Sequence, residues 1–102
     1  MIVRIWHGRT PRARGDEYAT FLHDRVLPDC RDASGNQEVI VLRRDEKDVS
    51  HFVIITRWES EGDIRDFTGG EILRAKFYSE HKDFLLELEP DVEHFTVVGQ
   101  AP

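Results

Sequence analysis

The stretch HFVIITRW constrains the fold more than any other part of the sequence. It is rich in β-branched and aromatic residues, so it predicts a β-strand. Side chains alternate between the two faces of a strand, which places Val53 and Ile55 on one face and Phe52, Ile54 and Trp58 on the other. Both faces are apolar, so the sheet that holds this strand must be covered on both sides.

The rest of the chain supplies three more strands and two helical regions, the second of which is divided into a short helix and a longer one. Asp16 is expected to cap the first helix, which should bend or end near Pro28. The order of elements is β-α-β-β-α-β, which predicts one α+β domain over residues 1–102, a ferredoxin-like sandwich with a four-stranded antiparallel sheet. The expected strands are 2–7, 38–44, 51–58 and 92–99, and the expected helices are 16–27, 60–67 and 71–88.

The first strand is also apolar on both faces, with Val3 and Ile5 opposite Ile2 and Trp6. Two helices cover only one face of a four-stranded sheet. In a chain of 102 residues the simplest cover for the other face is a second copy. We therefore expect a homodimer through the sheet face, the alternative being that these side chains stay half-exposed.

The charge and the cysteine content limit the kinds of partner that the chain is expected to bind. The chain has 20 acidic and 14 basic residues, a net charge of -6, which repels nucleic-acid phosphates. Its one cysteine, Cys30, has no intramolecular partner and is interpreted as a structural thiol. The opening MIVRIWHGRT lacks a long apolar run. We expect a soluble, cytoplasmic protein that binds neither nucleic acid nor membrane.

Several motifs in the second half of the chain point to one family. The motifs are Trp58 at a strand end, the WES turn, FTGG at 67–70, Tyr78, FLLELEP at 84–90 and His94, with Gly35 and Asn36 before the second strand. With these motifs the chain resembles the antibiotic biosynthesis monooxygenase domain family of dimeric α/β barrels, over nearly its whole length.

The resemblance implies a cofactor-independent oxygenase that acts on a small aromatic or quinone-type molecule between helices and sheet. The substrate's own enolate or phenolate would reduce oxygen, so the protein needs a dry apolar cavity, a group to hold a proton and donors for the developing anion. Trp58 and Tyr78 would shape the site, and Trp6, Phe67 and Phe77 would wall it. The alternative is that these are ordinary core aromatics.

His81 is the expected base. It lies on one helical stripe with apolar residues, so it should point inward, unless it sits at the edge of the stripe. A buried neutral imidazole serves as a general base or binds haem iron. Haem-degrading relatives pair such a histidine with an asparagine on the first strand, whereas IVRIWH has none. We therefore predict no cofactor, with haem as the alternative. The stripe is Phe77, His81, Phe84, Leu85 and Leu88.

The other histidines show neither HxxxH nor Cys-His ligand spacing, so no metal site is expected. His94 is predicted to contact the substrate. Arg43, Arg44 and Arg57 are expected to pair with acidic residues across strands. A dimer that binds a ligand without catalysis remains a second alternative.

Overall fold

The computed structural model describes residues 1–72, 81–89 and 91–102. It contains a four-stranded sheet in the order β2-β3-β1-β4, with every neighbouring pair antiparallel. The predicted ferredoxin-like α+β fold is confirmed. The strands are β1 (Ile2–Pro11), β2 (Asn36–Glu46), β3 (Val49–Trp58) and β4 (Glu93–Thr96).

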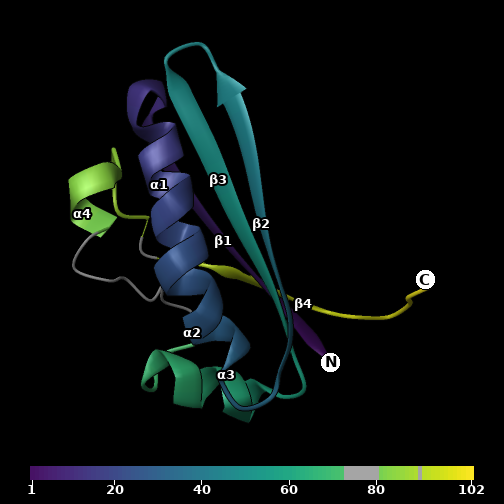
Figure 1. The fold of residues 1–102 in the computed structure, drawn as a ribbon. Coiled ribbons are helices and arrows are strands. Elements are labelled where there is room, and N and C mark those ends of the chain that lie inside the picture. Colours follow the sequence, from purple (N-terminus) through teal and green to yellow (C-terminus); the bar gives the residue numbers. More distant parts are fainter. Residues whose placement is uncertain (73–80, 90) are drawn as a thin grey trace.

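One helical stretch covers one face of the sheet (Figure 1). It consists of α1 (Gly15–Phe21), the π-helical turn η2 (Leu22–Val26) and α2 (Leu27–Arg31). Its buried side chains recur every four residues. In a regular α-helix four residues turn through about 400°, which is about 40° more than one full turn, so successive buried side chains would move around the helix and away from the sheet. The wider π turn offsets this drift.

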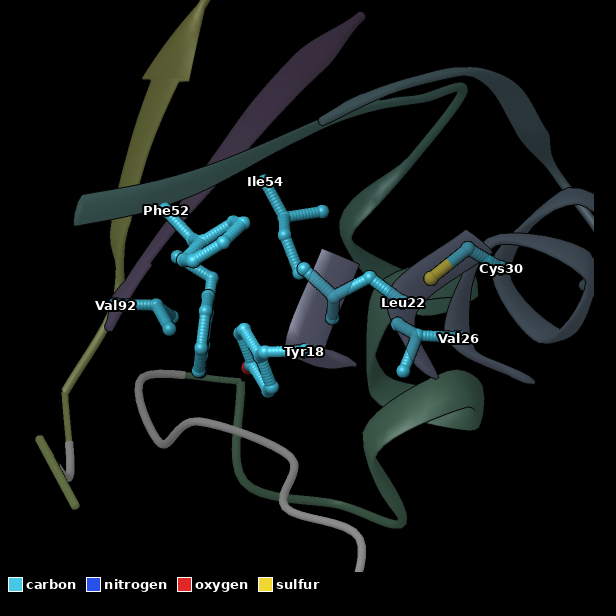
Figure 2. Close-up of a cluster of buried hydrophobic side chains, with 8 residues drawn as sticks. Tyr18, Leu22, Val26, Cys30, Phe52, Ile54 and Val92 are labelled. Atoms are coloured by element: carbon cyan, nitrogen blue, oxygen red, sulfur yellow. The ribbon is translucent and has the colours of Figure 1, made fainter. Parts of the chain in front are cut away.

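Figure 2 shows the result: the side chains of the helical stretch point toward those of β3. Tyr18 packs edge-on against Phe52, with ring centroids 4.9 Å apart. The cluster is the core of the domain, and Val92 closes it from the residues just before β4. Its buried members are Trp6, Tyr18, Leu22, Val26, Cys30, Phe52, Ile54 and Val92.

Several boundaries differ from the prediction: β4 covers Glu93–Thr96 where 92–99 was expected, and β2 covers Asn36–Glu46 where 38–44 was expected. β1 continues past Gly8 to Pro11, because its pairing with β3 runs to Val49. The helical stretch passes Pro28, which stands in the first turn of α2 where a missing N–H is tolerated. Asp16 does not cap α1; its carboxylate instead accepts a hydrogen bond from Arg43.

The helix predicted over 71–88 is wrong at both ends: Glu71 and Ile72 are not helical, and residues 85–88 are not helical either, while 73–80 lie outside the described residues. α4 (His81–Phe84) stops at Phe84, and the next residues lie along β1 instead. The Leu86 N–H donates to the Arg9 carbonyl at 2.8 Å, and Arg9 also holds Glu87. This strap, residues 85–89, binds β1 beyond the part that pairs with β4.

The strands alternate between a helical face and an outer face. On the outer face, apolar side chains form a continuous patch across all four strands, none of them fully buried. Phe95, Leu42 and Ile40 are the most exposed. We call this set the outer apolar patch: Val3, Ile5, Ile40, Leu42, Val53, Ile55 and Phe95. Among the described residues, no helix combines the length and apolar character needed to span a membrane.

The short helix α3 (Glu61–Thr68) begins and ends as its sequence indicates. Ser60 is the N-cap, and its hydroxyl accepts the Asp63 N–H at 3.2 Å. Gly69, with φ 86°, ends the helix in the left-handed conformation and donates to the Arg65 carbonyl. α3 lies at one end of the helical layer (Figure 1) and carries Phe67 toward the core.

The Ser60 cap gives a stability prediction. We expect Ser60→Ala to lower the free energy of unfolding by about 1 kcal/mol, because the Asp63 N–H loses its acceptor. Urea denaturation followed by circular dichroism measures it. Ser34→Ala, at an exposed turn, should change stability by less than about 0.5 kcal/mol. Equal effects of the two changes would contradict the capping role.

Candidate functional site

A small cavity lies between the helical stretch and the sheet. Its walls are largely apolar, but Arg4, Thr56, Cys30 and His81 bring polar groups to it. It measures about 40 Å³, room for about three waters. The lining residues are Arg4, Trp6, Val26, Cys30, Ile54, Thr56, Phe67 and His81.

His81 lies in α4 and is 2% exposed, so it points inward as expected and does not lie at the edge of its stripe. Three aromatic rings surround it: Trp6 and Phe21 with centroids at 5.5 Å, and Tyr18 at 6.0 Å. Burial raises the pKa of Tyr18 above its ordinary value, so its hydroxyl stays protonated. The rings hold the imidazole in one place against the cavity.

Trp6 reaches this position because β1 has a glycine two residues further on. A Cβ atom on Gly8 would collide with the Trp6 ring and lie 2.9 Å from Leu85. The glycine therefore allows the indole to lie along β1 beneath the strap. Trp6 thus lines the cavity where the sequence predicted a wall.

Arg4 supplies a positive charge from the helical face of β1, where it is 4% exposed. Its Nη1 donates to the Ile72 carbonyl at 2.6 Å and lies 3.1 Å from His94 Nε2. Burial lowers the pKa of Arg4 to about 10, so the guanidinium remains charged at neutral pH. A cation at an apolar cavity attracts the anionic oxygen of a ligand.

His94 faces Arg4 across the β1–β4 pair. A guanidinium only donates, so His94 Nε2 must accept and be unprotonated. Burial, and then the Arg4 charge, lower the pKa of His94, while Glu61 acts in the opposite direction. His94 does not line the Arg4–His81 cavity; it lines a neighbouring hollow of about 150 Å³ with Glu61 and Ile72.

The other predicted site residues fall into two groups. Phe67 lines the cavity, whereas Trp58 lies one layer behind it, fully buried. The Trp58 ring is 5.1 Å from Phe67, and its Nε1–H donates to Thr56 Oγ1 at 2.8 Å. Trp58 therefore supports two lining residues without reaching the cavity. Phe77 and Tyr78 lie outside the described residues.

Sequence reasoning missed Arg4, Thr56 and the contribution of Cys30 to the lining. One signal for Arg4 was present: it lies between Ile2 and Trp6 on the same apolar strand face. Of the three strand arginines, only Arg57 approaches an acidic residue across strands as expected, namely Glu38. Arg43 instead binds Asp16 of α1 and Asp45 of its own strand, and Arg44 approaches Glu46 of its own strand.

The Arg4–His94 contact predicts a pH dependence of stability. The unfolded chain protonates His94 near pH 6.5, and the folded chain does so only at lower pH. The contribution of His94 to the free energy of unfolding is therefore present above about pH 6.5 and falls as the pH drops toward the pKa of His94 in the folded chain. In urea denaturation from about pH 7.5 to about pH 5.5, His94→Gln should show a shallower loss than wild type. His23→Gln, at an exposed helix position, should keep the wild-type slope; an unchanged slope in His94→Gln would refute this role.

Comparison with known proteins bears on the fold. No protein-family model and no curated protein matches the chain. A protein of unknown function from Nitrosomonas europaea is similar in structure, with a TM-score of 0.70 and 15% identity over 99% of this chain and 92% of that one. So is a "putative antibiotic biosynthesis monooxygenase" from Bacillus cereus, with a TM-score of 0.67 and 15% identity over 100% of this chain and 97% of that one. The resemblance indicated by the sequence motifs is confirmed at the level of the fold.

Proposed function

We propose that this chain is a cofactor-independent oxygenase that acts as a homodimer on a small aromatic or quinone-type molecule. One observation supports this most: the Arg4 guanidinium and the His81 imidazole line the same small, largely apolar cavity. A cation and a base at one apolar site are what the deprotonation of a weak acid and the stabilisation of its anion require.

In the proposed reaction His81 takes a proton from the substrate, and Arg4 holds the resulting enolate or phenolate oxygen. The electron-rich anion then reduces oxygen directly. For a substrate with an activated methylene, one oxygen atom becomes the new carbonyl, and the other leaves as water with the two hydrogens of the methylene. The proton held by His81 is returned to the departing oxygen, so the imidazole ends as it began.

The size of the cavity limits what enters it. A cavity of about 150 Å³ takes benzene, whereas this one measures about 40 Å³. It has room for oxygen and the reacting end of a substrate, and a whole ring requires the lining to move. The half-buried Phe67 is the apolar lining residue contributed by α3. A haem is larger still and would require a greater displacement of the lining than a single ring does.

Oxygen uptake tests this proposal. We expect anthrone or a monocyclic hydroquinone to drive oxygen consumption by the wild-type protein. His81→Gln should slow it roughly a hundredfold to ten-thousandfold by removing the base. Arg4→Gln should slow it roughly a hundredfold to a thousandfold by removing the charge that stabilises the anion. An oxygen electrode and product analysis measure both.

Matched controls are available on the surface. His23→Gln and Arg65→Gln remove the same side-chain types from exposed helix positions and should keep the wild-type rate. Saturable binding of these molecules without oxygen uptake would instead favour a ligand-binding dimer. A Soret shift on adding hemin, lost in His81→Gln, would replace the proposal with haem binding.

The proposed dimer uses the outer apolar patch. The helical layer covers only the opposite face of the sheet (Figure 1). Phe95 is 54% exposed and Leu42 is 46% exposed, although each lies opposite an apolar residue of the neighbouring strand, Val3 and Val53 respectively. An apolar surface that crosses a whole sheet favours association, and a second copy offers a surface of the same kind.

A charge placed in the patch should separate the subunits. We expect wild-type protein to sediment as a dimer, and Leu42→Glu to shift it toward monomer because the new carboxylate would be buried unpaired. Analytical ultracentrifugation over a concentration series measures the shift. Thr20→Glu adds the same charge on the helical layer and should stay dimeric. A monomeric wild-type protein would refute the dimer and leave the cavity chemistry to be tested separately.

A further inference from the structure

Two imidazoles meet on the outer face of the sheet, away from the Arg4–His81 cavity. His7 lies on β1, and His51 lies on β3 opposite Arg9. His7 Nε2 is 3.2 Å from His51 Nδ1, and the rings are near parallel, 22° apart, with centroids at 5.5 Å. The proposed oxygenase reaction uses neither side chain.

The separation of these nitrogens matches two ligands of one metal ion. Imidazole nitrogens bind zinc at about 2.0–2.1 Å, and two of them on a tetrahedral ion lie about 3.3 Å apart. The observed separation of 3.2 Å is close to this value, and a turn of each ring about its side-chain torsions would direct both nitrogens at one ion. Because β1 and β3 are paired along their length, the backbone holds both residues at this distance.

The far nitrogen of each ring has a carboxylate partner. His7 Nδ1 lies 2.7 Å from Glu89 Oε2, and His51 Nε2 lies 3.9 Å from Glu46 Oε1. A carboxylate behind an imidazole keeps the proton on that side and leaves the other nitrogen basic, as it does behind metal-binding histidines. With its proton held on Nδ1 by Glu89, His7 accepts a hydrogen bond at Nε2 from His51 Nδ1–H, and a metal ion bound by both nitrogens would replace that proton.

In a single subunit the surroundings allow an ion to enter, and in the proposed dimer a second copy would border the pair at Leu42 and Val53. The side chains of His7 and His51 are 36% and 19% exposed. A hollow of about 260 Å³ adjoins them, lined also by Leu42, Arg43, Arg44 and Val53. Arg43 is bound by Asp16 and Asp45, and Arg44 lies 3.8 Å from Glu46, so acidic groups offset both cations. Glu46 and Glu89 supply negative charge near the pair.

We propose that His7 and His51 bind one divalent transition-metal ion such as Zn²⁺, with Glu89 orienting the His7 ring. Within the described ranges, no group of three or more His, Cys, Asp or Glu side chains is arranged to hold a metal. The described residues therefore provide two ligands, and water fills the remaining positions. The site is independent of the oxygenase chemistry and ties β1 to β3 on the outer face.

Calorimetric titration of tag-free, chelator-treated protein with Zn²⁺ tests the site. We expect one saturable ion per chain. Binding should be lost in His7→Gln and in His51→Gln. Glu89→Gln should bind about tenfold to a hundredfold more weakly, because His7 loses the partner that orients it. The control is His23→Gln, which removes another histidine hydrogen-bonded to a carboxylate and should bind as wild type does.

A second measurement needs no variant. Substoichiometric Cu²⁺ should broaden the imidazole NMR signals of His7 and His51 before those of His23 and His94. A stoichiometry of one ion per two chains, with both histidines still required, would also support the metal site and would indicate that a second copy supplies the remaining ligands. No saturable Zn²⁺ binding, or binding that survives both His7→Gln and His51→Gln in folded protein, would overturn the proposal.

Discussion

The antiparallel pairing of β1 with β3 is the constraint on which the other features depend. It runs from Ile2 opposite Trp58 to Pro11 opposite Val49 without a break. Because side chains alternate along each strand, this one register sends Arg4 and Trp6 toward the helices and His7 to the outer face. A slip by one residue would exchange the two faces and remove both the cavity and the histidine pair.

The cavity joins parts of the chain that are far apart in sequence. Arg4 and Thr56 come from the two central strands, whereas His81 comes from α4. The strands set the position of the charge, and the aromatic rings around His81 set the position of the imidazole. A polar site of this kind exists only in the folded chain, where burial lowers the pKa of Arg4.

Much of the fold was predictable, because strand alternation and the order of elements are properties of local sequence. The inward orientation of His81 followed from its apolar stripe, although the helix ends at Phe84. The end was not predictable, since it depends on a hydrogen bond between Leu86 and the distant Arg9. The first helix was predicted to bend or end near Pro28, but the helical stretch continues, because the first turn of a helical segment accepts a proline.

The candidate sites were less predictable than the fold. Arg4 is a single charged residue in an apolar strand, and sequence alone does not show that its charge is buried. His7 and His51 are 44 residues apart, so no local spacing marks them as a pair. They come together only through strand register, which a motif search does not follow. Trp58 was assigned to the site from its place in a motif, and its side chain lies behind the lining instead.

The π turn in the helical stretch has a consequence for how this sequence aligns with others of the same fold. A π turn is equivalent to one residue added to an α-helix. A protein with a regular helix here would reach the position of Cys30 one residue sooner. Aligning the two sequences then requires a gap inside a helix, where gaps are ordinarily penalised. The turn that keeps Tyr18, Leu22, Val26 and Cys30 over the sheet thus also makes this sequence harder to align with that of a chain whose helix is regular.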